Sequence, residues 1–406
     1  MTAMCPCRDD RSMDSTWLKS RIGAHVTALA EEIGPRPPGS PANRVATDYL
    51  RMVLGATGLE VSELPFSCRW WDPGPAAVQV GGAWIDVAPA PYSGPCDVRG
   101  QVRRIGDDAA LAEAPIEPGR ILVIHGDLVS DPYFPKAFPF LDQPEQRSRI
   151  DRLEHLQPAA VIAVGSTTRA IPLLEDGDLD FPYAVVPRSL GDRMRDGREV
   201  GVRIGGELLD GEGVNVSARH GPPGPRLVLS AHVDSKVTGP GAFDNAGGVA
   251  TLLALAEAGL PAGAAVELVF FNGEDHYQAP GEQAWLAATD LAEVGQIVNL
   301  DGAGVVGHGT AVSMLACPQD LEDRVRAAVA RRPGWSIGPE WYESDHAIFA
   351  MRGIPSLAIT SAGVHQLLTS VAHTERDTPR MVDPAILAGV AGFLEAWLRE
   401  PSRVGV

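Results

Sequence analysis

Six residues in the C-terminal half carry side chains that can bind metal ions or move protons. They are His232, Asp244, Glu274, Asp275, Asp301 and His373. Zinc accepts imidazole and carboxylate ligands, and two zinc ions held about 3.5–4 Å apart need one bridging group and further ligands for each ion. Two histidines, two terminal carboxylates, one bridging carboxylate and one free carboxylate acting as a base would meet this need. The inventory therefore indicates a site for two zinc ions.

Short apolar runs lead into most of these residues and predict the strands that position them. The runs at 226–231, 266–271 and 296–300 end shortly before a candidate ligand, and apolar residues at helical spacing predict a helix over 244–260. A further strand is expected over 356–360. Largely apolar runs bounded by turns are typical of parallel strands buried between helices. Because sites in such sheets form beyond the carboxyl ends of the strands, we expect the six side chains to converge there.

The remaining chain predicts a discontinuous domain with an insert. Helical spacing predicts two N-terminal helices, over 17–32 and 42–54. From residue 73 to 213 proline and glycine are dense, and short β-like runs recur at 76–80, 98–105, 120–124, 159–164 and 183–186. We interpret residues 73–213 as a β-rich domain inserted into a catalytic domain made of residues 1–72 and 214–406. The fold class expected for the catalytic domain is α/β, with a mixed, mostly parallel central sheet flanked by helices.

Composition excludes several classes of function. The chain has 406 residues, of which 45 % are hydrophobic, and 52 acidic against 34 basic residues give a net charge of −18. Such a surface repels phosphate backbones and anionic lipids, so neither nucleic acid nor a membrane is expected as a partner. None of the three lysines follows a glycine, which excludes a Walker A loop. With no apolar signal region or transmembrane stretch evident, we expect a cytoplasmic protein.

Seven short motifs surround the candidate residues and follow one another in a fixed order. They are Ala231-His-Val-Asp-Ser235, Gly241-Ala-Phe-Asp-Asn-Ala-Gly-Gly-Val249, Phe270-Phe-Asn-Gly-Glu-Asp275, Asn299-Leu-Asp301, Ser344-Asp-His-Ala-Ile-Phe349, Gly353-Ile-Pro355 and His373-Thr-Glu-Arg-Asp-Thr378. This series resembles the zinc aminopeptidase family M28, which also includes glutamate carboxypeptidase-like peptidases, glutaminyl cyclases and the non-catalytic transferrin receptor. Residues 33–43 resemble the N-terminal segment of the same family. The insert resembles a protease-associated domain.

The resemblance implies a set of metal ligands. His232 and Asp301 would hold one zinc ion, His373 and Asp275 the other, and Asp244 would bridge them. The family usually has glutamate at the position of Asp275, and aspartate is one methylene shorter. This departure implies altered metal affinity, and cobalt or manganese could take the place of zinc.

The resemblance also implies roles for residues around the metals. Glu274 would be the general base that takes a proton from the attacking water and passes it to the leaving amine. Asp234 matches the carboxylate that orients the imidazole of the nearby histidine. An aromatic residue that often precedes the last histidine is absent, so Tyr342 and His346 are candidates for the oxyanion donor. Asp345 is a candidate for shaping the substrate pocket.

Together these observations predict a dinuclear zinc exopeptidase. The interpretation that fits best is an aminopeptidase that removes N-terminal residues from short peptides by attack of metal-bound hydroxide. One alternative is an amidohydrolase acting on a specific small amide metabolite, and another is a glutaminyl cyclase-like enzyme that uses one zinc. A non-catalytic binding protein fits less well because the chain keeps all five ligands. A homodimer is left open by the sequence.

Overall fold

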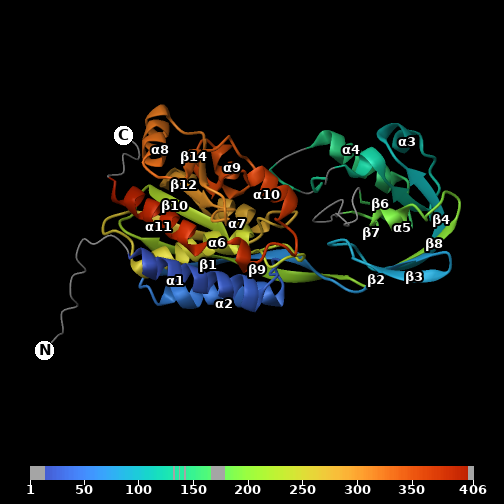
Figure 1. Ribbon diagram of the computed structural model, residues 1–406, viewed down its shortest axis with the longest axis horizontal. Helices are drawn as coiled ribbons and strands as arrows, with labels where there is room; N and C mark the ends of the chain where they lie inside the picture. The colour runs from blue at the N-terminus through green and yellow to red at the C-terminus, as the bar shows by residue number, and fades with distance from the viewer. Residues whose placement is uncertain (1–13, 131–132, 137, 141–142, 166–178, 401–406) are drawn as a thin grey trace.

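The computed structural model describes residues 14–130, 133–136, 138–140, 143–165 and 179–400, which form two sheets with their helices (Figure 1). An eight-stranded sheet is built from both ends of the chain. In spatial order its strands are β1 (Glu60–Asp72), β9 (Glu207–His220), β11 (Val266–Phe271), β10 (Arg226–His232), β12 (Val294–Leu300), β15 (Ser356–Ser361), β13 (Thr310–Leu315) and β14 (Trp335–Ile337). The chain between β1 and β9 forms the second sheet, which lies to one side of the first in Figure 1.

The eight-stranded sheet is mixed, as the sequence predicts. Strands β11, β10, β12 and β15 run parallel at its centre, while β9 is antiparallel to both β1 and β11, and β13 is antiparallel to β15. The apolar runs at 226–231, 266–271, 296–300 and 356–360 all lie in the four parallel strands. The parallel arrangement places the carboxyl ends of these strands at one edge, where the candidate residues gather.

Alternating side chains of the central strands divide between two cores. In β10, Leu229 belongs to a core that includes α1 (Ser15–Val26), α2 (Pro41–Gly55), α6 (Gly247–Ala258) and α11 (Pro384–Arg399). Val228 belongs instead to a core with Trp285 of α7 (Pro280–Ala288) and Phe349 of α9 (Asp345–Ala350). Because successive residues of a strand point to opposite faces, helices cover both faces of the sheet.

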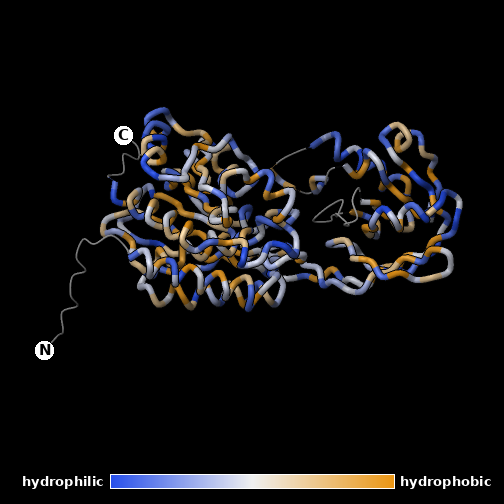
Figure 2. Tube along the Cα trace, viewed as in Figure 1, coloured by the Kyte–Doolittle hydropathy of each residue, from blue (hydrophilic) through white to orange (hydrophobic). Residues whose placement is uncertain are grey.

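The two N-terminal helices form because their sequences carry both apolar spacing and a start signal. Figure 2 shows hydrophobic and hydrophilic residues alternating along α1 and α2. Ile22 and Leu50, one from each helix, are fully buried in the core. Ser40 accepts a hydrogen bond from the backbone N–H of Asn43 at 3.1 Å, and Pro41 follows as the first residue of α2. Helix α1 passes into a π-helical turn at Thr27–Ile33.

The second sheet has seven strands in a different topology. Their order is β3 (Ala83–Val87), β2 (Ala76–Val80), β8 (Glu199–Ile204), β4 (Cys96–Ile105), β5 (Ile121–Ile124), β6 (Ala160–Val164) and β7 (Tyr183–Val186). Strands β4 to β7 run parallel, whereas β3, β2, β8 and β4 pair antiparallel. Two cores, one on each face, include residues of α4 (Pro144–His155) and α5 (Arg188–Gly191) respectively.

Aromatic side chains form contacts between the chain segment of the second sheet and residues of the eight-stranded sheet and its loops. Tyr92, which precedes β4, contacts the rings of His276 and Tyr277 with centroids 5.5 and 5.2 Å apart, and it stacks on Trp71 at the end of β1. His276 and Tyr277 lie in the loop after β11, so the chain between β1 and β9 contacts the loop that carries Glu274 and Asp275. Among the described helices, none has both the length and the apolar character needed to cross a bilayer.

Candidate metal centre

Five predicted ligands meet at the carboxyl edge of the central strands. His232 ends β10, Asp301 directly follows β12, and Asp275 lies four residues beyond the end of β11. Asp244 lies in the turn before α6, and His373 lies in the loop after α10 (Val364–Ser370) with a left-handed φ of 57°. The fold thus brings residues separated by up to 141 positions into one cluster.

The cluster has two halves that share one carboxylate. Nε2 of His232 lies 3.0 Å from Oδ1 of Asp244 and 3.5 Å from Oδ1 of Asp301. Nε2 of His373 lies 3.0 Å from Oδ2 of Asp244 and 3.0 Å from Oδ1 of Asp275. Each oxygen of Asp244 therefore faces a different imidazole, which is the arrangement expected of a bridging ligand.

These donor atoms fit divalent cations. Both ring nitrogens of His232 and Oδ2 of Asp275 are buried without a hydrogen-bond partner. Buried polar atoms are normally satisfied, since leaving one unpaired costs about 1–3 kcal/mol. A mixed set of imidazole nitrogens and carboxylate oxygens is the donor chemistry that zinc accepts, and cobalt and manganese accept related sets. Burial alone would raise the pKa of Asp244, but its contacts with both histidines hold that pKa below the usual range.

Glu274 and Asp234 occupy different positions around the cluster. Burial raises the pKa of Glu274 well above its usual range, although His232 opposes this effect. Oδ1 of Asp234 accepts the backbone N–H of Gly273 at 2.8 Å, and Oδ2 accepts that of Asp275 at 3.1 Å. Nδ1 of His232 lies 3.7 Å from Asp234, beyond hydrogen-bond distance. Asp234 therefore hydrogen-bonds the loop that carries Glu274 and Asp275, whereas its distance to the imidazole of His232 is too long for a hydrogen bond.

The helix expected over 244–260 begins later, and the difference concerns a candidate ligand. Helix α6 starts at Gly247, and Asp244 has a non-helical backbone with φ −125° and ψ 85°. Its N–H donates to Oδ2 of Asp377 at 3.0 Å. Asn245 donates from Nδ2 to Leu300 O at 2.7 Å and accepts the N–H of Gly248 through Oδ1. These contacts hold Asp244 outside the helix with its carboxylate between the two histidines.

Arg36 is a positioning residue that the sequence reasoning did not single out. It is fully buried, and its Nε and two Nη atoms donate to the carbonyl oxygens of Val233 at 2.6 Å, Pro240 at 2.7 Å and Gly241 at 2.9 Å. Burial lowers the pKa of Arg36 to about 10, although nearby carboxylates including that of Asp234 oppose the shift. The guanidinium fixes the loop between His232 and Asp244.

A second network of amides fixes the loop after β11. Asn43 and Asn272 exchange a reciprocal pair of side-chain hydrogen bonds of 2.8 and 2.9 Å. The backbone N–H of Asn272 donates to Oδ1 of Asn215 at 2.9 Å. Nδ2 of Asn215 donates to Gly281 O at 2.7 Å. All three amides are buried, so helix α2, strand β9 and the Glu274 loop are tied together.

Replacing Asn43 with alanine is expected to lower the free energy of unfolding by about 1–3 kcal/mol, because Asn272 is left with unsatisfied buried groups. Asn272→Ala should cost a similar amount, and the double variant should cost clearly less than the sum of the two. Denaturant unfolding of the four proteins measures this coupling. Strictly additive costs would show that the reciprocal amide pair does not act as a unit.

The three candidates for substrate contacts lie in different environments. Tyr342 is 51 % exposed, and its hydroxyl donates to Oε2 of Glu340 at 2.9 Å. His346 is fully buried, and Nε2 lies 2.7 Å from Trp341 O. That carbonyl requires the proton on Nε2, which leaves Nδ1 as an acceptor. Burial lowers the pKa of His346 to about 4 and raises the pKa of Asp345, in the first turn of α9, to about 8.

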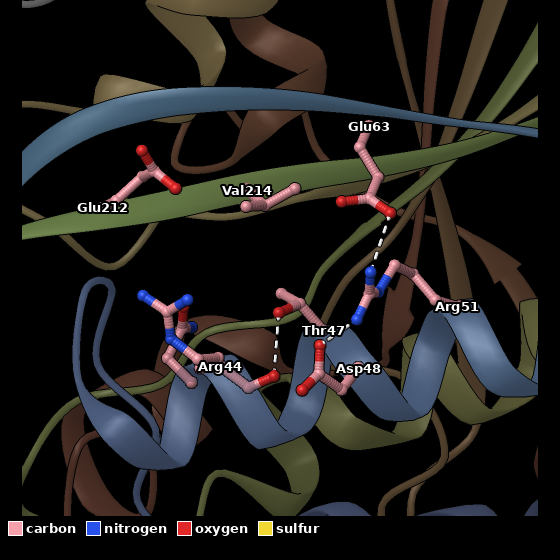
Figure 3. Close-up of a pocket in the computed structure, with 8 residues that line it drawn as sticks. Arg44, Thr47, Asp48, Arg51, Glu63, Glu212 and Val214 are labelled. Atoms are coloured by element: carbon pink, nitrogen blue, oxygen red, sulfur yellow. Dashed lines mark hydrogen bonds and ion pairs between the residues drawn. The ribbon is translucent and has the colours of Figure 1, made fainter.

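A groove elsewhere on the molecule is separate from this cluster. It holds about 140 Å³ between α2 and the β1–β9 ribbon (Figure 3). The residues that line it are Asn43, Arg44, Thr47, Asp48, Arg51, Glu63, Glu212 and Val214. Within the groove Arg51 donates to Glu63 at 3.2 Å and also pairs with Asp48. None of the predicted ligands lines it, so the groove has no part in the candidate metal centre.

Comparison with known proteins matches the part of the chain that carries the candidate ligands to a peptidase family. Residues 215–397 match the model of peptidase family M28, and all five predicted ligands fall within this range. A probable lipoprotein aminopeptidase of Mycobacterium tuberculosis is 26 % identical over 246 residues, which are 57 % of this chain and 47 % of that protein. The chain thus spans about half the length of the curated relative that it matches.

Solved structures share the fold along almost the whole chain. An aminopeptidase from Aneurinibacillus sp. strain AM-1 is 21 % identical with a TM-score of 0.73, and the match covers 97 % of each chain. A zinc aminopeptidase from Bacillus subtilis is 17 % identical with a TM-score of 0.75, covering 97 % of this chain and 98 % of its own. At these identities the likeness establishes the fold, including the mixed sheet with helices on both faces.

Proposed function

Because residues 215–397 match the model of peptidase family M28, we propose that the chain is a hydrolase of this family. Its proposed activity is that of a dinuclear zinc aminopeptidase that removes N-terminal residues from short peptides. One observation carries the proposal. The two oxygens of Asp244 each lie 3.0 Å from a different imidazole, so one carboxylate can serve two metal positions. Cobalt or manganese could occupy the same donors.

In this proposal the first metal position is formed by His232 and Asp301, the second by His373 and Asp275, and both use Asp244. When bound, the ions lower the pKa of water and polarise the carbonyl of the scissile amide. The distances between imidazole and carboxylate atoms support this assignment, since each half already gathers one histidine and two carboxylates.

Glu274 is proposed as the base that accepts a proton from the attacking water and returns it to the leaving amine. Burial raises the pKa of Glu274, which makes its ionised form a stronger base toward water. Asp234 would act through Asp275, because it accepts the backbone N–H of that residue. Asp345, Tyr342 and His346 remain proposals for contacts with the substrate.

Cleavage at the N-terminal end is proposed from the similar proteins reported above. The curated relative and the two solved structures named there are aminopeptidases by their printed names.

The decisive experiment is mass spectrometry of free and N-acetylated short peptides incubated with the zinc-loaded protein. Stepwise loss of N-terminal residues from the free peptides alone is the expected result. Loss of ammonia from glutamine-led peptides would indicate a cyclase instead, and loss of C-terminal residues a carboxypeptidase. No change in any peptide, with metal bound, would favour an amidase of narrow substrate range or a binding protein.

The insert at 73–213 is proposed to be a protease-associated-like domain that limits the length of peptides reaching the metals. Contacts of Tyr92 with His276 and Tyr277 support this placement. Strand pairing aligns Asp72 with Glu207, and residues 207–213 belong to β9, so a two-residue Asn-Gly turn can replace residues 73–206 without changing the register. The shortened protein should cleave longer peptides than the full chain. Unchanged size selectivity, with activity on dipeptides retained, would contradict the proposal.

Location and assembly remain predictions. A cytoplasmic location is proposed from the sequence, and cell fractionation should then recover the protein in the cytoplasmic fraction. Light scattering of the purified protein measures its molar mass, which distinguishes a monomer from a homodimer.

A further inference from the structure

Lys236 stands out because lysine is rare in this chain and this one lies against a predicted metal ligand. It follows Ser235 in the loop after β10, and only three lysines occur among 406 residues. Its Nζ donates to the backbone carbonyl of Asp275 at 2.6 Å and lies 3.7 Å from Oδ1 of the same residue. The side chain is 11 % exposed, so solvent screens the charge only weakly.

The oxygen that faces Lys236 is also the one that faces the second imidazole. Oδ1 of Asp275 lies 3.0 Å from Nε2 of His373. A divalent cation held by His373 and Asp275 would therefore share the carboxylate of Asp275 with an ammonium group. The shared negative charge attracts the ion less strongly, and the two positive charges repel each other.

The other half of the cluster has no equivalent of this lysine. Within the part of the chain that the structure describes, the ion pairs of Asp301 and Asp244 involve only histidines. Arg36, the other buried cation nearby, directs its donors to backbone carbonyls. The electrostatic difference between the two halves is therefore concentrated on Asp275.

The loop that carries Asp275 is also held by contacts that do not involve Lys236. Asp234 accepts the backbone N–H of Asp275 at 3.1 Å, and Nε2 of His276 lies 2.8 Å from Arg69 O. Tyr92 adds a ring contact to His276 from the insert. With three other contacts on this loop, loss of the lysine should change the charge at Asp275 more than its position.

Resting on the proposed function, we propose that Lys236 makes the two metal positions unequal. Its ammonium weakens binding of a divalent ion at the His373–Asp275 position, so the His232–Asp301 position fills first. Lys236 affects the metal through its charge beside Asp275 and does not contact the substrate. The short side chain of Asp275 and the adjacent lysine then both lower the affinity for the second ion.

The test is titration of the metal-free full chain with Zn²⁺ by calorimetry, with metal content measured after gel filtration. The wild type is expected to bind two ions with unequal constants. In Lys236→Met, which keeps the length of the side chain without its charge, the second constant should tighten about 10-fold while the first stays the same. Lys236→Arg, the matched control that keeps the charge, should behave as the wild type. Lys236→Gln is a second neutral variant in case methionine disturbs the fold.

His373→Ala locates the effect. With the second imidazole removed, the remaining ion should bind equally to proteins with lysine or methionine at position 236. A second constant that is unchanged or weaker in both neutral variants would overturn the proposal, as would equal constants in the wild type. These outcomes leave the peptidase function intact, because it is measured separately on peptides. Failure of the wild type to bind any ion would overturn both.

Discussion

Glu274→Gln is expected to lower kcat on a free peptide by about 10³-fold while leaving metal content unchanged. Glutamine keeps the volume of the side chain but cannot accept a proton from water. Glu274 is not one of the residues whose atoms converge around the imidazoles of His232 and His373, so both metal positions should survive the change. The measurement is steady-state kinetics at saturating zinc together with metal analysis.

Glu282→Gln is a matched control for this prediction. Glu282 lies in α7, and burial raises its pKa well above the usual range, as it does for Glu274. The substitution replaces a second buried carboxyl group and leaves the proposed base in place. We expect less than about a 10-fold change in kcat for this variant. Equal losses in both variants would show that any change to a buried carboxyl group in this region lowers kcat, and that Glu274 is not the proton acceptor.

The sequence predicts that the candidate ligands lie close together because most of them follow strands with a strong pattern. The apolar runs before His232 and Asp301 belong to β10 and β12, which are parallel neighbours in the sheet. Parallel neighbours bring the residues after them to one edge. The side chains of His232 and Asp301 meet there, 3.5 Å apart, as the topology requires.

Two strands that the sequence did not predict, β3 and β8, carry a weaker pattern. Strand β3 is an edge strand of the second sheet with no buried residue, so burial imposes no apolar run on it. Strand β8 includes Gly201, where an added Cβ would lie 3.0 Å from the ring of Trp84, which reaches across β2 from β3. A glycine in a short run weakens a strand signal. These elements are fixed by partners that are distant in sequence.

Local patterns also cannot reveal side chains that act through the backbone. An aspartate that precedes apolar residues at helical spacing is typical of a helix start, so the sequence predicts a helix that begins at Asp244. The structure instead places Asp244 before α6, because its N–H is bound by Asp377 from 133 residues away. Arg36 lies in a proline-rich segment that is typical of an exposed loop, yet it is fully buried. Only the folded chain brings its backbone partners within reach.

Arg36→Lys is expected to lower the free energy of unfolding by about 3–5 kcal/mol, although it keeps the positive charge. The guanidinium spans three separate carbonyl groups, of Val233, Pro240 and Gly241, with three different nitrogens. One lysine ammonium has a single nitrogen and cannot reach all of them. The unmet carbonyls are buried, and each carries its own cost. Denaturant unfolding of the metal-free protein measures the loss.

The same substitution should also weaken metal binding. This second measurement distinguishes a role in placing the metal ligands from a role in stability alone. Gly241 lies three residues before Asp244, and Val233 directly follows His232, so the loop held by Arg36 begins and ends near two predicted ligands. Arg44→Lys, an exposed position on α2, is the matched control and should change neither quantity. If Arg36→Lys were destabilised but bound Zn²⁺ with wild-type constants, the loop would hold its shape without the guanidinium. Weaker binding in the folded variant would instead mean that a residue nearly 200 positions from His232 in sequence sets the geometry of the metal centre.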